Sequence, residues 1–195
     1  MVRNVLETRL PSAFGPFSLK EVPAGKRLTE LEFLFPLRRL SGLELTELFS
    51  RHLGSACAVE GFSNRNRFRF DDVEGFMKGF IDLVFEFDGR FYIVDWKSNF
   101  LGPRLEDYGP EGLRKAVRES LYDLQYTVYT VALHRFLESR LPGYRYDTHF
   151  GEVFYLFLRG VDPAYGSEYG VYRARPSAES IETLSGALAG EGGLL

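Results

Sequence analysis

Two aspartates and a lysine stand out as residues that could do chemistry, because a predicted β-hairpin places them on one face. Residues 79–100 contain two β-rich runs on either side of Asp88-Gly89, the dipeptide that most strongly favours a two-residue turn. Counting outward from that turn places Asp82 directly opposite Asp95. Lys97 follows Asp95 by two residues, so its side chain projects from the same face.

Opposed carboxylates on apolar strands repel each other, since their Cβ atoms lie about 4.5–5.5 Å apart. Such a pair needs a bound cation or has one raised pKa, and hard oxygen ligands suit Mg²⁺, with Mn²⁺ able to substitute. A metal ion there would polarise a phosphoryl oxygen and activate water, while Lys97 would contact the attacking water or stabilise developing negative charge. The alternative is a structural ion pair between one aspartate and the lysine.

The bulk properties are those of a globular chain without a strongly basic or acidic balance. It has 195 residues, 45% of them hydrophobic, and a formal net charge of −3. One cysteine, Cys57, fits a reducing compartment, and no apolar run is long enough for a signal peptide or a membrane span. We expect a cytoplasmic protein with no membrane partner, made of an extended lead-in at 1–26 and a single domain at 27–195 with its core at about 27–162.

Hydrophobic periodicity indicates an α/β chain in which strands and helices are mixed along the sequence. Besides the hairpin, strands are expected at 31–37 and 150–159, with a short one at 17–22. Helices are expected at 41–53, 111–120, 121–141 and 177–189, the first of them begun by a capping box of Ser41 and Glu44. Residues 54–75 show no periodicity and are expected to be irregular.

Four motifs in order carry a resemblance to a known family: GFIDLVF, DWKSNFLG, LQYTVYTVALHRFL and YLFLRGVD. Together they resemble the nuclease domains of RecB-type helicase–nucleases, which belong to the PD-(D/E)XK superfamily, and the likeness covers about residues 20–165. The resemblance implies a restriction-endonuclease-like α/β fold, a mixed central sheet flanked by helices. It also implies a Mg²⁺-dependent exodeoxyribonuclease domain that takes part in the repair of double-strand breaks.

The same resemblance assigns roles to individual residues. Asp82 and Asp95 match the metal-binding acidic residues, Trp96 would lend its backbone carbonyl to the metal, and Lys97 matches the lysine of the motif. Gln125 and Tyr129 match a Gln-X-X-X-Tyr motif that contacts DNA, and their spacing puts them on one face of a helix.

Two further residues, Ser98 and Arg67, are expected to contact the DNA backbone. Without the resemblance, Gln125 and Tyr129 would suit an ordinary amphipathic helix, and an arginine such as Arg67 would suit a solvated surface.

The resemblance implies single-stranded DNA as substrate, with a RecB helicase portion and RecC- and RecD-like subunits as partners. The family's metal site normally includes a histidine well upstream of the first aspartate, and the chain is expected to begin after it. This leaves two alternatives to a working nuclease: a catalytically incomplete fragment that docks RecA or a partner subunit, or a folded but inert remnant.

Overall fold

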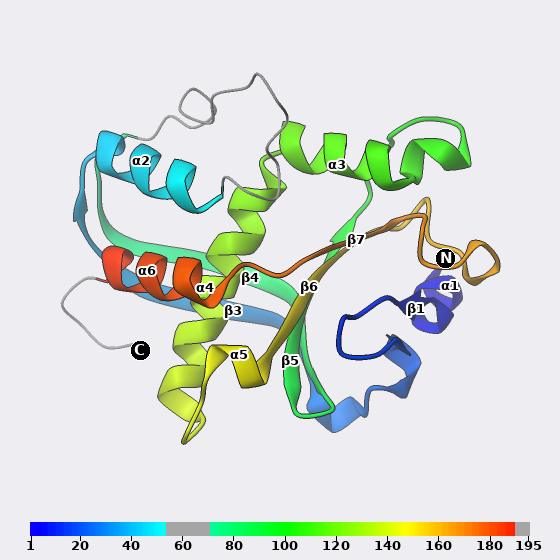
Figure 1. Cartoon of the computed structure of the whole chain (residues 1–195), viewed down its shortest axis with the longest axis horizontal. Coiled ribbons are helices and arrows are strands. Elements are labelled where there is room, and N and C mark those ends of the chain that lie inside the picture. Colours follow the sequence, from blue (N-terminus) through cyan, green and yellow to red (C-terminus); the bar gives the residue numbers. More distant parts are fainter. Residues whose placement is uncertain (54–70, 190–195) are drawn as a thin grey trace. The chain divides into compact units, whose positions relative to one another are not determined.

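A five-stranded sheet is the central element of the computed structural model, which describes residues 1–53 and 71–189. The strand order is β3-β4-β5-β6-β7 (Figure 1). The strands are β3 (Arg27–Leu40), β4 (Val73–Phe87), β5 (Arg90–Lys97), β6 (Phe150–Phe157) and β7 (Val171–Ala174). The sheet is mixed, because β5 and β6 pair in parallel whereas β4–β5 and β6–β7 pair antiparallel. This confirms the predicted α/β fold class.

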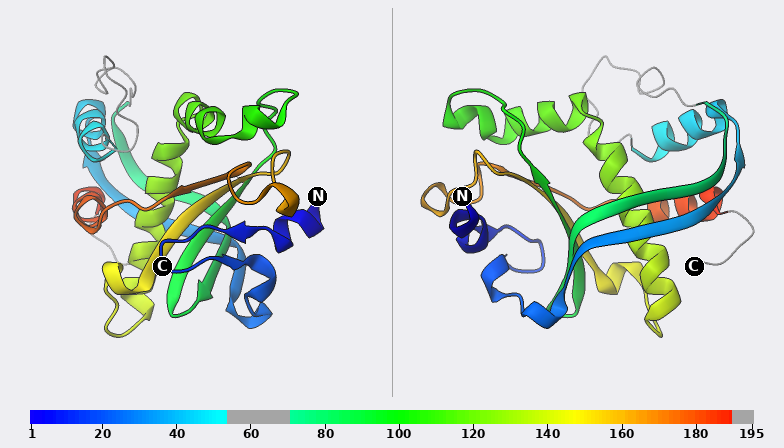
Figure 2. Two further views of the ribbon diagram at one scale, coloured as in Figure 1. Left: turned by 45° about the vertical axis from the view of Figure 1, so that its right-hand side comes forward. Right: turned by 180° about the vertical axis from the view of Figure 1, so that it is seen from behind.

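Helices come before, between and after the strands along the chain, and two further views draw them (Figure 2). They are α1 (Val2–Glu7), α2 (Gly42–His52), α3 (Pro110–Glu119), α4 (Tyr122–Arg140), α5 (Tyr146–His149) and α6 (Ala178–Leu188). Leu121, between α3 and α4, has a φ of 54°, a conformation that interrupts a right-handed helix. The two helices expected at 111–120 and 121–141 are therefore separate, as predicted.

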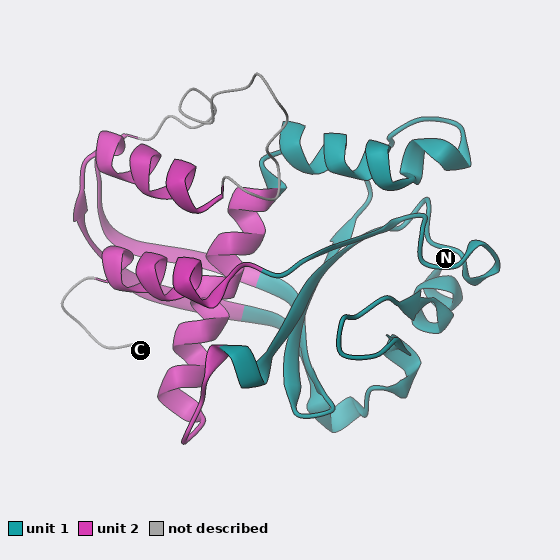
Figure 3. Ribbon diagram, in the orientation of Figure 1, with its two compact units in different colours: residues 1–31, 81–122, 147–175 teal, residues 32–80, 123–146, 176–195 magenta. Residues whose placement is uncertain are grey.

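The chain divides into two compact units, coloured separately in Figure 3. Unit 1 consists of residues 1–31, 81–122 and 147–175, and unit 2 of residues 32–80, 123–146 and 176–195.

The core of unit 1 is formed by one apolar face of β4, β5 and β6 together with the N-terminal segment. Phe17 lies 4.6 Å from Phe87 and 5.7 Å from Phe85, measured between ring centres. The lead-in expected to be extended contains helix α1, strands β1 (Arg9–Leu10) and β2 (Phe17–Ser18), and short 3-10 turns. That expectation was wrong because apolar residues of this segment, such as Leu10, are buried in the core and order the backbone.

The β4–β5 hairpin has the predicted register. Asp88 and Gly89 have φ angles of 50° and 73°, as a type I′ turn requires at both central residues. The paired residues run outward from Phe87 and Arg90 to Leu83 and Val94. The next residues outward from the turn on the two strands are Asp82 and Asp95.

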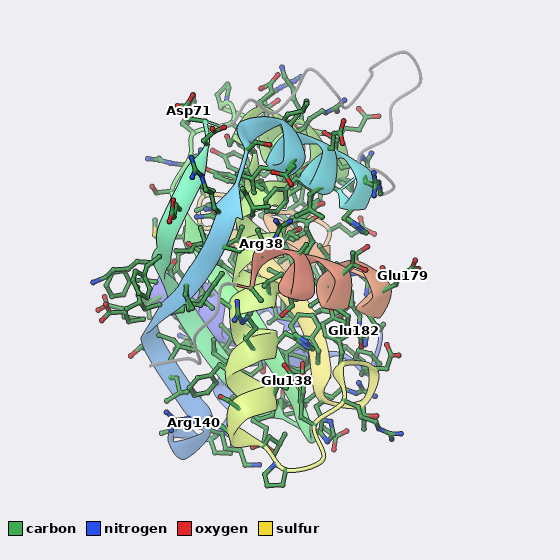
Figure 4. All side chains as sticks on the ribbon, turned by 90° about the vertical axis from the view of Figure 1, so that its left-hand side faces the viewer. Arg38, Asp71, Glu138, Arg140, Glu179 and Glu182 are labelled. Atoms are coloured by element: carbon green, nitrogen blue, oxygen red, sulfur yellow. The ribbon has the colours of Figure 1, made fainter. Side chains whose placement is uncertain are left out.

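In unit 2, the capping box predicted at Ser41 and Glu44 is present. The Glu44 backbone N–H donates to Ser41 Oγ, and the Ser41 backbone N–H donates to the Glu44 carboxylate at 2.8 Å. Helices α2 and α6 are in contact, and Arg38 of β3 donates from Nε to the carbonyl of Ala187 in α6 at 2.7 Å (Figure 4). Strand β4 begins at Val73, so the expected irregular segment ends earlier than residue 75.

Candidate active site

The predicted lysine and second aspartate form a buried ion pair on β5. Lys97 Nζ lies 2.7 Å from Asp95 Oδ2. The two residues are 8% and 4% exposed, and charged residues this far buried are seldom found unpaired. Both side chains project from the same face because they are two residues apart on one strand. This shared face is the arrangement that the sequence predicted.

Asp82 is fixed by the backbone of the neighbouring strand. Its carboxylate oxygen Oδ2 accepts a hydrogen bond from the backbone N–H of Trp96 at 2.9 Å. This bond lies beyond the last paired residues of the hairpin, Leu83 and Val94. The side chain of Asp82 therefore satisfies a backbone donor at the end of β5 and is held next to the Asp95–Lys97 pair.

The electrostatic environment of Asp95 disfavours its ionised form. Burial raises the pKa of the Asp95 carboxyl, the hydrogen bond and positive charge of Lys97 lower it, and the negative charge of Asp82 raises it further. The net direction is upward. One lysine does not fully compensate this carboxylate, so a second cation at the site would be stabilising.

Two tyrosines that the sequence did not single out surround the lysine. Lys97 Nζ lies 3.8 Å from the ring centre of Tyr122 and 4.5 Å from that of Tyr155. Tyr155 is brought there by the parallel pairing of β5 and β6, which matches it with Asp95. Both distances are within the range of cation–π attraction. No local signal marks these residues, because Tyr155 belongs to an apolar strand typical of a core and Tyr122 is the first residue of an ordinary helix.

The two rings are held in place by their own hydrogen bonds. The Tyr122 hydroxyl donates to Asn99 Oδ1 at 3.1 Å, and the Tyr155 hydroxyl donates to the backbone carbonyl of Tyr122 at 3.4 Å. The rings also contact each other edge to face, with centres 5.4 Å apart. Asn99, Tyr122 and Tyr155 thus form a scaffold around the Lys97 ammonium group.

Three of the four residues predicted to contact DNA lie in the described part of the chain, and they belong to different units. Gln125 and Tyr129 share one face of α4, where Gln125 Nε2 donates to the Tyr129 hydroxyl at 2.9 Å. They belong to unit 2, whereas the aspartates and Lys97 belong to unit 1. Ser98 is exposed directly after β5. Arg67 lies outside the described residues.

The oxygen atoms of Asp82 and Asp95 fit a hard divalent cation. Within residues 1–53 and 71–189, no group of three or more His, Cys, Asp or Glu side chains is placed to hold a metal ion. Two carboxylates are too few for a closed structural zinc site. They are sufficient for Mg²⁺, which usually binds through one or two carboxylates and completes its shell with water and substrate phosphates.

Comparison with known proteins identifies the class. A family model described as the PD-(D/E)XK nuclease superfamily matches residues 20–189. The chain belongs to this superfamily.

Individual relatives agree with that assignment. The chain is 51% identical over 118 residues to the RecBCD enzyme subunit RecB of Haemophilus influenzae, covering 60% of the chain and 10% of the relative. It is 39% identical over 176 residues to the subunit of the same name from Escherichia coli, covering 89% of the chain and 14% of the relative. The chain therefore spans less than a fifth of the length of these relatives.

No helix among the described residues is both long and apolar enough to cross a bilayer.

Proposed function

We propose that this nuclease domain hydrolyses DNA phosphodiester bonds with Mg²⁺ held by Asp82, Asp95 and the backbone carbonyl of Trp96. The observation that carries the proposal is the buried Asp95 carboxylate, which lies 2.7 Å from Lys97 and next to Asp82, itself fixed by the Trp96 N–H at 2.9 Å. Two neighbouring carboxylates, one of them buried, favour binding of a cation.

The residues of the site have distinct tasks in this reaction. Bound Mg²⁺ supplies polarisation of a phosphoryl oxygen and a lowered pKa of coordinated water. Lys97 presents its ammonium group to the attacking water or to the negative charge that develops on the phosphate. Gln125 and Tyr129 orient the DNA strand from α4, and Ser98 contacts its backbone.

The relatives' name supports a proposal about the partners, and the substrate is proposed from the resemblance to RecB-type nuclease domains. We propose that the chain is the nuclease portion of a RecB-type helicase–nuclease, assembled with RecC- and RecD-like subunits and acting in double-strand break repair. It would digest a single strand supplied by the helicase, as an exonuclease, with Mn²⁺ able to replace Mg²⁺.

A second candidate function is docking of RecA or of a partner subunit without cleavage. It is favoured by one observation: in the described part of the chain no third His, Cys, Asp or Glu joins the two aspartates in a metal-binding group. A docking module would use its surface alone, so it would be indifferent to substitution of the buried Asp95.

The test is digestion of linear single-stranded DNA with Mg²⁺ and, separately, Mn²⁺, by the wild type and by Asp95→Ala purified in parallel. A matched control is Asp88→Asn, which removes a carboxylate from the turn of the same hairpin, where Asn tolerates the positive φ. We expect the wild type and Asp88→Asn to cut and Asp95→Ala to be inactive. Equal cutting by all three, or none by any, would refute the nuclease proposal and leave docking as the function to test.

A further inference from the structure

The chain that leaves β5 directly after Lys97 borders an open pocket of about 300 Å³ in unit 1. Its lining includes Phe100, Arg104, Leu105, Tyr108 and Arg159. That volume is at the lower end for sites that take small ligands. We propose that this pocket is a subsite for one nucleotide of the single-stranded DNA substrate, a proposal that rests on the nuclease function above.

The pocket adjoins the proposed active site through the backbone. The Leu158 N–H donates to the carbonyl of Lys97 at 2.9 Å, and Arg159 Nε donates to the carbonyl of Ser98 at 3.2 Å. The pocket therefore lies at the carboxyl ends of the parallel strands β5 and β6. In open α/β sheets, ligands bind at this end of parallel strands.

Tyr108, one of the residues that line the pocket, is held in place by two hydrogen bonds. Tyr108 is buried, and its hydroxyl accepts a hydrogen bond from the Leu101 N–H at 3.2 Å. The backbone carbonyl of Tyr108 accepts a second hydrogen bond, from the Gly170 N–H at 2.9 Å. A ligand that enters the pocket thus meets a surface that needs little ordering, which lowers the entropic cost of binding.

The wall of the pocket offers a stacking surface and a cation. Phe100 is 68% exposed, and the guanidinium carbon of Arg159 lies 5.9 Å from its ring centre. Arg104 is paired with Asp107 at 3.0 Å. Arg159 has no carboxylate partner within 4.0 Å in the described part of the chain, so its charge is available to an anion.

A nucleotide is the ligand that matches both features. Its base has a π-face that stacks on an exposed aromatic ring whatever the base identity, and its phosphate pairs with a guanidinium group. The base would lie on Phe100 and the phosphate at Arg159. Because Phe100 follows Lys97 by three residues, this nucleotide would be next to the one being cleaved, and the subsite would hold the strand without reading its sequence.

The test measures binding of a fluorescein-labelled oligothymidylate to the 195-residue chain by fluorescence anisotropy in EDTA, where no cleavage occurs. Loss of one stacked base corresponds to about 1–3 kcal/mol, so we expect Phe100→Ala to weaken binding by about 5- to 150-fold. Phe76→Ala is the matched control, because Phe76 is 63% exposed on the strand β4 and is outside the pocket. It should bind as the wild type does.

Two further variants separate stacking from charge. Phe100→Trp should restore binding, and its indole fluorescence should be quenched when the oligonucleotide is added. Arg159→Gln should weaken binding. It should also reduce the magnitude of the slope of log affinity against log salt concentration by about 0.7, which is the contribution of one phosphate contact on a single strand. Arg159→Lys should keep the salt dependence.

The subsite is refuted if Phe100→Ala binds like the wild type, if Phe76→Ala weakens binding equally, or if the Phe100→Trp indole is not quenched. These outcomes are distinct from failure of the nuclease proposal. Binding that depends on Phe100 in a chain that does not cut would refute cleavage alone. Cutting in a chain whose DNA binding ignores Phe100 would refute the subsite alone.

Discussion

The ammonium nitrogen of Lys97 lies 3.8 Å from the ring centre of Tyr122, a residue 25 positions further along the chain. The aromatic face attracts the cation, and the ring also restricts where the flexible lysine can move. Lys97 is therefore positioned by packing as well as by its ion pair with Asp95.

We predict that Tyr122→Leu lowers the rate of DNA cleavage at saturating substrate, because it removes the aromatic face from Lys97. A cation–π contact of about 0.5–2 kcal/mol corresponds to about 2- to 30-fold in rate. Tyr122→Phe keeps the ring and should remain close to the wild type. Tyr165→Leu, at an exposed tyrosine of the same unit, is the control. Equal losses for Tyr122→Leu and Tyr122→Phe would contradict a role for the ring.

Substitutions of Asp82 should separate its charge from its hydrogen bond. Asp82→Asn retains an oxygen acceptor for the Trp96 N–H, so we expect cleavage to be lost with little change in thermal stability. Asp82→Ala removes the acceptor as well and should lower the free energy of unfolding by about 0.5–1.5 kcal/mol more than Asp82→Asn does. Urea unfolding in EDTA measures the difference. Identical stability of the two variants would show that the bond to Trp96 contributes nothing.

His134 should make the stability of the protein depend on pH. It is 6% exposed on α4, and its ring contacts Tyr144. Burial lowers the pKa of His134 from 6.5, the carboxylates of Glu138 and Glu182 (Figure 4) raise it, and Arg135 lowers it. The net direction is downward.

The sign follows from which state binds the proton more tightly. Because the folded-state pKa is the lower one, the unfolded chain takes up a proton first as pH falls below 6.5. The stabilising contribution of neutral His134 is thus present above pH 6.5 and is lost as pH falls towards the folded-state pKa. We expect the melting temperature of His134→Gln to fall less than that of the wild type between about pH 8 and about pH 5. Melting temperatures that fall equally with pH in the wild type and in His134→Gln would contradict this expectation.

Two glycine substitutions should have opposite effects on stability. A Cβ at Gly151 would collide with the ring of Tyr92, which is buried in the core, so Gly151→Ala should cost about 1–3 kcal/mol. A Cβ at Gly186 in α6 meets no atom within 4 Å. Gly186→Ala should therefore stabilise by about 0.5–1 kcal/mol through better helix propensity. Chemical unfolding of both variants checks the signs, and a stable Gly151→Ala would show that the core can expand there.

Local features of the site could be predicted from the sequence because they depend on residues close together in the chain. The Asp88-Gly89 turn sets the hairpin register, and strand periodicity then places Asp95 and Lys97 on one face. The capping box at Ser41 is also local, since it is determined by two residues, Ser41 and Glu44, three positions apart. Each of these follows from backbone geometry over a few residues.

Only the tertiary structure decided what surrounds these residues. The parallel pairing of β5 with β6 joins segments more than fifty residues apart and brings Tyr155 next to Asp95. Burial of the N-terminal segment depends on the apolar face that the assembled sheet offers. Such contacts arise from the packing of segments far apart in the chain, so no local spacing of residues encodes them. The raised pKa of Asp95 is a consequence of the desolvation that this packing causes.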